Sequence, residues 1–172
     1  MNRRTKIFLI GFMGSGKSTT GRKLASCLSW SFIDLDKRIE EKAGMKIPDI
    51  FSERGESWFR GIESEALRNV NSETKTVIST GGGTPCFGNN MEFMLENGLT
   101  IYLRLTPEQL EKRLGGSSTI RPLLTDVNRD DLGKYIQNKL GERERWYQRA
   151  DITVDGYETD IPGLCSLVRK WI

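Results

Sequence analysis

The feature that most constrains this chain is a glycine-rich loop, residues 11–18 with the sequence GFMGSGKS, which matches the pattern GxxxxGK(S/T). The apolar run Lys6–Ile10 before it predicts a buried strand, and the helical spacing of apolar residues after it predicts a helix over Lys17–Leu28. Such a helix N-terminus favours phosphate, because its free N–H groups and the positive end of its dipole face the anion. The loop therefore predicts a nucleoside triphosphate site.

Individual positions of the loop have distinct roles in this prediction. Gly14 and Gly16 let the backbone approach the phosphates closely. Lys17 brings charge to the β- and γ-phosphate oxygens, and the Ser18 hydroxyl is a ligand for Mg²⁺. The predicted nucleotide contacts in the loop are Gly14, Ser15, Gly16, Lys17, Ser18 and Thr19. The structural alternative, a plain strand-to-helix turn, has no need of a lysine and a serine at these positions.

Composition excludes several classes of protein. A length of 172 residues fits one domain. The net charge is only +3, and the lysines and arginines are interspersed with acidic residues, so no nucleic-acid partner is predicted. The chain has no histidine, which excludes hydrolytic triads and histidine-ligated zinc. The first apolar run breaks after five residues, which predicts neither a signal peptide nor a membrane span.

The three cysteines, Cys27, Cys86 and Cys165, are widely spaced and form no CxxC pair. We expect them to be reduced and to act as small buried hydrophobes, which favours a cytoplasmic protein. Cys86 lies beside a glycine run and is left open as an accessible, reactive thiol.

Further apolar runs predict four more strands, at residues 31–35, 76–80, 99–105 and 151–154. Helical patterns separate them, and this alternation predicts an α/β sandwich with a mostly parallel sheet and ligands at its carboxyl edge. One predicted helix begins after Thr106 and runs to about Leu114, and a last one begins after Thr159 or Asp160. The expected buried stripes are Leu164, Val168 and Trp171 on the last helix, and Phe59, Ile62, Ala66 and Val70 on the helix after Gly55.

Two acids follow the second predicted strand. Asp34 and Asp36 are two residues apart, so an extended strand places them on one side, at the edge where the loop opens. One can hold Mg²⁺ through water while the other receives a proton from an attacking hydroxyl, a division that phosphoryl transfer uses. The alternative for Asp36 is the N-cap of a helix that begins at Lys37.

The remaining motifs distinguish among proteins with such loops. A formal DxxG at residues 130–133 lies in a helical pattern, and residues 138–141 lack the acid that reads guanine, so a GTPase switch is excluded. The other motifs are IPDIFSERGESWFRGIESE at 47–65, the triple glycine Gly81, Gly82 and Gly83, and RPLL at 121–124. In this order, and from Ile7 to about Ile172, they resemble the shikimate kinase family.

The resemblance implies one domain, residues 1–172, with a nucleoside-monophosphate-kinase-like fold of five parallel strands. It also implies a substrate-binding helical region at about 34–62 and a lid at about 113–127. The implied activity is the phosphorylation of the shikimate 3-hydroxyl by ATP with Mg²⁺, in aromatic amino-acid biosynthesis. We expect a cytoplasmic monomer whose partners are these small molecules, with neither nucleic acid nor membrane.

Carried over position by position, the resemblance implies three sets of site residues. The catalytic set is Lys17, Asp36 and Arg121. The nucleotide set adds Arg113, Arg121 and Pro162 to the loop, with Arg113 and Pro162 enclosing adenine, and the metal set is Ser18 and Asp34. The acceptor set is Asp36, Arg60, Gly81, Gly82, Gly83 and Arg143, in which the arginines bind the carboxylate.

Several positions keep an alternative. Arg60 is spaced from Glu56 and Glu63 like a surface ion pair on a helix, and Arg121 could be a solvated loop arginine. The glycines could form a merely flexible loop. Spacing from a following tyrosine selects Arg143 as the second carboxylate ligand, with Arg145 as a neighbouring candidate. The rival functions are a gluconate-type sugar-acid kinase and a nucleotide-binding regulator without turnover.

Overall fold

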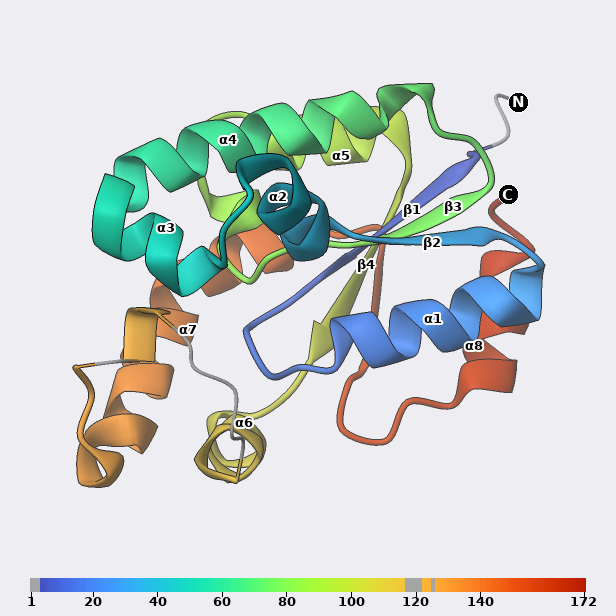
Figure 1. The fold of residues 1–172 in the computed structure, drawn as a ribbon. Coiled ribbons are helices and arrows are strands. Elements are labelled where there is room, and N and C mark those ends of the chain that lie inside the picture. The colour runs from blue at the N-terminus through green and yellow to red at the C-terminus, as the bar shows by residue number, and fades with distance from the viewer. Residues whose placement is uncertain (1–3, 117–121, 125) are drawn as a thin grey trace.

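The structure, a computed structural model, describes residues 4–116, 122–124 and 126–172. Its strands are β1 (Lys6–Ile10), β2 (Ser31–Asp34), β3 (Thr76–Ser79), β4 (Leu99–Arg104) and β5 (Ile152–Asp155). They form one sheet in the order β2-β3-β1-β4-β5, and every pairing is parallel. The predicted α/β class with a five-stranded parallel sheet is confirmed. Figure 1 shows this sheet between layers of helices.

Helices cover both faces of the sheet. They are α1 (Lys17–Leu28), α2 (Leu35–Ala43), α3 (Ile47–Arg54), α4 (Glu56–Asn69), α5 (Asn90–Asn97), α6 (Pro107–Gly115), α7 (Leu132–Tyr147) and α8 (Ile161–Val168). Short 3₁₀ helices occur at Val70–Ser72, Thr84–Cys86, Pro122–Leu124 and Arg129–Asp131. Helices α1 and α8 lie on one face, and α4 and α5 lie on the other (Figure 1). No helix among the described residues is both long and apolar enough to cross a bilayer.

The strand sequences explain this layering. All five residues of β1 are buried, because the strand lies at the centre of the sheet with helices above and below it. Successive side chains point to opposite faces, so Ile7 and Leu9 join the core beneath α1 and α8, while Phe8 and Ile10 join the larger core on the other face. The edge strands β2 and β5 are more exposed.

Two helix starts follow the predicted capping chemistry. Thr106 caps α6 through a reciprocal pair of hydrogen bonds with Gln109, and the Asp160 carboxylate accepts from the Gly163 N–H at the start of α8. The expected stripe on α8 is wrong in one member. Leu164 and Val168 are buried, but Trp171 lies beyond the end of the helix and is 42% exposed.

The second strand ends one residue earlier than predicted, and this changes the role of the two acids. Asp34 is both the last residue of β2 and the N-cap of α2, where its Oδ1 accepts from the Lys37 N–H at 3.4 Å. Asp36 lies in the first turn of α2. The predictions that both acids share one side of a strand and that Asp36 could be the cap are therefore wrong.

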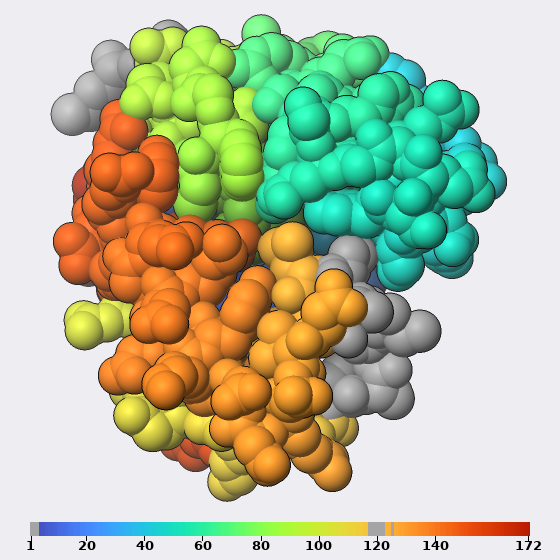
Figure 2. Space-filling view, turned by 90° about the vertical axis from the view of Figure 1, so that its left-hand side faces the viewer, coloured from blue at the N-terminus to red at the C-terminus, as the bar shows by residue number. Residues whose placement is uncertain are grey.

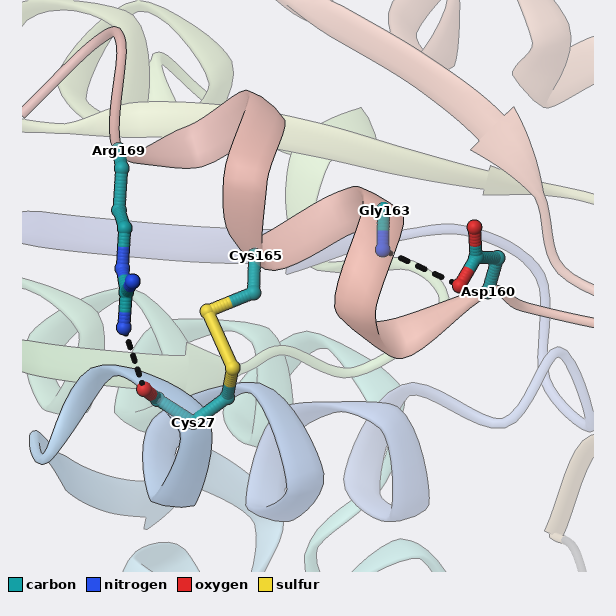
Figure 3. Close-up of a disulfide and its surroundings, with 5 residues drawn as sticks. All are labelled: Cys27, Asp160, Gly163, Cys165 and Arg169. Atoms are coloured by element: carbon teal, nitrogen blue, oxygen red, sulfur yellow. Dashed lines mark hydrogen bonds between the residues drawn. A yellow bond between two sulfur atoms is a disulfide. The ribbon is translucent and has the colours of Figure 1, made fainter.

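The expectation of three reduced cysteines is also wrong. Cys27 at the end of α1 and Cys165 on α8 form a disulfide, although they are 138 positions apart in sequence (Figure 3). Cys165 is buried and Cys27 is exposed. Spacing along the chain gave no sign of this pairing, because it is the packing of α1 against α8 that brings the two sulfurs together. The Arg169 side chain donates to the Cys27 carbonyl beside the disulfide, as the same figure shows.

Candidate active site

Three adjoining cavities follow the carboxyl edge of the sheet. The loop cavity, about 340 Å³, is lined by the glycine-rich loop and by the ends of β2 and β3. The arginine cavity, about 260 Å³, lies beside it and contains Arg60 and Arg143. The tyrosine cavity, about 250 Å³, lies on the other side and contains Tyr157. Met13, Asp34, Asp36, Gly81 and Gly82 line both the loop cavity and the arginine cavity, so the two are continuous.

The glycine-rich loop wraps the N-terminus of α1. Gly16 is the N-cap of α1 with φ +87°, a left-handed conformation that side chains rarely adopt, so glycine is required there. Lys17 is buried, and its Nζ donates to the carbonyl oxygens of Gly11 and Phe12 at 2.8 and 2.9 Å. The loop therefore holds its own cation in place at the phosphate end of the cavity.

Ser18 and Asp34, the predicted metal set, are in direct contact. The Ser18 hydroxyl donates to Asp34 Oδ2 at 2.7 Å and lies 3.3 Å from the Ser79 hydroxyl. Within the described residues, no group of three or more acidic or cysteine side chains could hold a metal alone. One hydroxyl and one carboxylate suit Mg²⁺, which keeps several waters and takes phosphate oxygens as further ligands. The donor set therefore fits Mg²⁺ bound together with a nucleotide.

The arginine cavity contains a buried ion pair. Arg60 and Glu63 lie one turn apart on α4, are 9% and 1% exposed, and form a hydrogen bond of 2.9 Å from Nη1 to Oε1. The more exposed Glu56 also accepts from Arg60, and the guanidinium carbon lies 4.1 Å from the centre of the Phe87 ring. The alternative of a surface ion pair is wrong for Arg60, because both partners of its closest pair are buried.

Arg143 faces the same cavity from α7. It is 5% exposed, and its buried Nη1 has no hydrogen-bond partner among the described residues. A buried guanidinium that lacks a counter-ion is costly, so this geometry favours an anion in the cavity. Arg145, the neighbouring candidate, is exposed, stacks over Trp146 at 4.0 Å and does not line the cavity.

The triple glycine packs against the charged groups. Built onto Gly83, a Cβ atom would lie 2.6 Å from Arg60 Nη2. At Gly81 it would lie 2.8 Å from Glu63 Oε2, and at Gly82 3.0 Å from the Met13 nitrogen. None of the three glycines has positive φ, so space and not backbone conformation excludes a side chain. A merely flexible loop would not have required this.

Cys86 lies beneath these charges. Burial raises the pKa of its thiol to about 11, and the nearby Arg143 and Arg60 guanidiniums offset only part of that shift. A thiol with a pKa this high is almost fully protonated at neutral pH and reacts slowly. Cys86 is a half-buried free thiol, and its raised pKa favours the interpretation of a small buried residue over that of a reactive thiol.

The tyrosine cavity is organised by Arg113 on α6. Its Nη2 donates to the carbonyl oxygens of Gly156 and Tyr157, and its guanidinium stacks on the Tyr157 ring at 5.2 Å. Pro162, the predicted partner of Arg113, is exposed and does not line this cavity. The residues that do line it from this side are Thr159 and Ile161.

Comparison with known proteins gives the family. A family model described as shikimate kinase matches residues 13–168. The shikimate kinase of Parabacteroides distasonis is 41% identical over 96% of this chain and 98% of its own length. The chain belongs to the shikimate kinase family. As a member of that family it is an ATP-dependent kinase.

Solved structures agree with this assignment. The shikimate kinase of Bacteroides thetaiotaomicron superposes with a TM-score of 0.88 and 38% identity, covering 96% of this chain and 97% of that one. The shikimate kinase of Acinetobacter baumannii, solved in complex with shikimate, gives a TM-score of 0.87 and 32% identity, covering 97% and 92%.

Sequence reasoning left several residues of the site without a role. Glu63 and Thr84 belong to the Arg60 cluster, in which the Thr84 hydroxyl donates to Glu63 Oε2 at 2.8 Å. Tyr147 contacts the glycine loop, and Tyr157 contacts Arg113. Two of these residues carried a readable signal: Glu63 through its spacing of three from Arg60, and Tyr147 through its spacing of four from Arg143. Arg121 lies outside the described residues, as do the rest of 117–121 and residue 125 in the predicted lid.

Proposed function

We propose that the protein transfers the γ-phosphoryl group of ATP to the 3-hydroxyl of shikimate, giving shikimate 3-phosphate and ADP in aromatic amino-acid biosynthesis. The observation that carries this proposal is the buried Arg143, whose Nη1 has no partner among the described residues, in the same cavity as the buried Arg60. Two guanidiniums facing one small cavity favour a carboxylate ligand. Shikimate supplies that carboxylate together with hydroxyl groups.

The order of the cavities suits an in-line transfer. The nucleotide occupies the tyrosine and loop cavities, with its base against Arg113 and its γ-phosphate near Lys17. The acceptor occupies the arginine cavity, held by its carboxylate at Arg60 and Arg143. Its free hydroxyl then faces the loop cavity across Asp34 and Asp36, the acids common to both linings.

Asp36 is the proposed base. As the acceptor oxygen bonds to the γ-phosphorus, the bond from that phosphorus to the β–γ bridging oxygen breaks, and the hydroxyl proton passes to the Asp36 carboxylate. Lys17 stabilises the charge that develops on the phosphoryl oxygens. The side chains of Ser18 and Asp34 would hold Mg²⁺, which offsets negative charge on the β- and γ-phosphates when bound.

Further parts of the proposal rest on family resemblance. Arg121 reaches the transferring phosphate from a lid at about 113–127, and residues at about 34–62 form the substrate-binding region. The role of Pro162 as a nucleotide contact beside Arg113 rests on the family resemblance alone, because Pro162 does not line the tyrosine cavity. The cytoplasmic location now rests on the family resemblance alone, because the Cys27–Cys165 disulfide removes the support that reduced cysteines gave to it. The protein is proposed to act as a monomer, and gel filtration with light scattering tests the oligomeric state.

A coupled assay of ADP release tests the activity. Purified protein is given MgATP with shikimate, quinate, gluconate or no acceptor. We expect release to depend on shikimate and to stop when EDTA removes the metal. Preference for gluconate would support a sugar-acid kinase instead, and nucleotide binding without turnover on any acceptor would support a regulator.

A further inference from the structure

We propose that Tyr147 is a positioning residue of the acceptor site, which fixes the middle peptide of the glycine loop and thereby aims the N–H groups of the loop at the acceptor. The inference rests on the proposed function, because it takes the arginine cavity as the place where shikimate binds. It concerns a side chain that does not line that cavity.

The three carbonyl groups of the glycine loop are held in two different ways. The Gly81 carbonyl accepts from the Thr84 N–H at 3.2 Å, and the Gly83 carbonyl accepts from the Cys86 N–H at 2.9 Å. Both are local turns of the backbone. The Gly82 carbonyl accepts instead from the Tyr147 hydroxyl at 2.6 Å, across 65 residues of sequence. Tyr147 is therefore the side chain on which the orientation of the middle peptide depends.

The N–H groups of the same glycines make no hydrogen bond to any described residue. All three glycines line the arginine cavity, so these donors are available to hydroxyl groups of an acceptor. A peptide between glycines has little intrinsic conformational preference, because glycine populates regions of φ and ψ that other residues avoid. Without an external hydrogen bond, the loop can turn its N–H groups away from the acceptor.

Tyr147 is itself rigidly held. Its side chain is fully buried, and its ring stacks on Tyr102 with centroids 5.1 Å apart, while the Tyr102 hydroxyl donates to Glu144 at 2.9 Å. Burial raises the pKa of Tyr147 above its ordinary value, so the hydroxyl remains a donor throughout the neutral range. Tyr147 follows Arg143 by one helical turn, so α7 supplies both the proposed carboxylate ligand and the support of the glycine loop.

Tyr147→Phe with Tyr102→Phe as its matched control tests the inference. Each substitution removes one hydroxyl from the same buried stack, but of the two hydroxyls only that of Tyr147 bonds to the glycine loop. For Tyr147→Phe we expect the KM for shikimate to rise about tenfold, with kcat and the KM for ATP changed less than about twofold. For Tyr102→Phe we expect a similar loss of thermal stability and an unchanged KM for shikimate.

Equal KM values in the two variants, or a Tyr147→Phe protein with wild-type KM, would overturn the inference. Failure of the proposed function looks different, because the wild-type protein would then not phosphorylate shikimate at all. If Tyr147→Phe does not fold, hydrogen exchange on the wild-type protein serves instead. Shikimate alone should slow exchange of the Gly82 and Gly83 amides, whereas an ATP analogue alone should not, and unchanged exchange with shikimate would reject the role of these donors.

Discussion

The loop cavity and the arginine cavity lie side by side but are built in opposite ways. The loop cavity is organised around one continuous stretch at the start of α1, joined by residues at the ends of β2 and β3 and on α6, and the cation Lys17 is already bonded to carbonyl groups of that stretch. The arginine cavity takes its charges from α2, α4 and α7, which are far apart in sequence, and leaves Arg143 Nη1 without a partner among the described residues. The loop cavity therefore holds its cation in a bonded position before a ligand binds, whereas the arginine cavity contains a buried donor that an anion can satisfy.

Two elements near the arginine cavity lie on one face of the molecule. Figure 2 shows α3 in teal and, in light orange, the residues that lead into α7, on the same face of the molecule. The 3₁₀ helix Pro122–Leu124 contacts α3, and Leu123 lines the arginine cavity. Substitutions in the two cavities should therefore have separable effects, on phosphoryl transfer in one and on acceptor recognition in the other.

The largest effect is expected in the loop cavity. Lys17→Ala should lower kcat by about 1,000-fold or more, because it removes the charge that stabilises the transferring phosphoryl group. Lys17 Nζ bonds to the Gly11 and Phe12 carbonyls of its own loop, so we expect thermal denaturation to show a retained fold. Lys170→Ala, an exposed change beyond α8, should leave both quantities unchanged. Turnover within about tenfold of wild type would contradict the role of Lys17.

The boundary between the cavities can be tested with the two neighbouring acids. Asp36→Asn should lower kcat by about 100- to 10,000-fold with retained ATP binding, because the amide cannot accept the hydroxyl proton. Asp34→Asn should instead raise the Mg²⁺ concentration needed for half-maximal activity, about tenfold or more, because it weakens the contact with Ser18. If Asp36→Asn changed the Mg²⁺ dependence and Asp34→Asn lowered kcat instead, the roles of base and metal ligand would have been assigned to the wrong acids.

The arginine cavity should respond through the acceptor. Arg60→Ala should lower kcat/KM for shikimate by about 30- to 5,000-fold, corresponding to about 2–5 kcal/mol, because the acceptor carboxylate loses one of the two guanidiniums that line its cavity. Arg60→Lys should rescue only weakly, since lysine keeps the charge but not the two parallel donors. Glu56→Gln is the matched control, and loss of this half-exposed partner should cost less than about threefold.

The ligand provides a second measurement at Arg60. The methyl ester of shikimate should bind wild-type protein poorly and should lose little more in Arg60→Ala, because its carboxylate charge is already absent. If acid and ester suffer equally from the substitution, Arg60 holds the structure of the cavity and does not bind the carboxylate.

The same contrast explains what could be predicted from the sequence. The loop cavity follows from one local motif, since GFMGSGKS between an apolar run and a helix determines where backbone N–H groups and Lys17 lie. The sheet follows from the alternation of apolar runs and helical patterns, with errors of about one residue at strand ends. The error at β2 arose because Asp34 stops the strand by capping the next helix, a choice that periodicity does not show.

Contacts between distant elements could not be read in this way. The buried state of Arg60 depends on the glycine loop packed against it, and the hydrogen bond from Tyr147 to Gly82 depends on how α7 crosses that loop. The pairing of Cys27 with Cys165 depends on α8 packing beside α1. In each case the residue types are visible in the sequence, but their proximity is a property of the folded chain.

The smallest effect on activity is expected far from both cavities, at the Cys27–Cys165 disulfide. Reduction should lower the free energy of unfolding by about 2–4 kcal/mol, because the bond closes a long loop, yet change kcat by less than about twofold. Cys27 lies about 15 Å further along α1 than Lys17, which separates the bond from the phosphate end of the helix. Thermal denaturation and ADP-release assays with and without dithiothreitol measure both quantities.

Two cysteine variants decide whether this response belongs to the disulfide. Cys27→Ser should be no more stable than the reduced wild type and should not respond to dithiothreitol. Cys86→Ser should keep the full response, because the pKa of Cys86, raised to about 11, leaves little thiolate to exchange with the disulfide. A wild-type protein whose stability ignores the reductant would show that the bond does not form. A large loss of kcat on reduction would instead show that α1 transmits a change at Cys27 to the loop cavity.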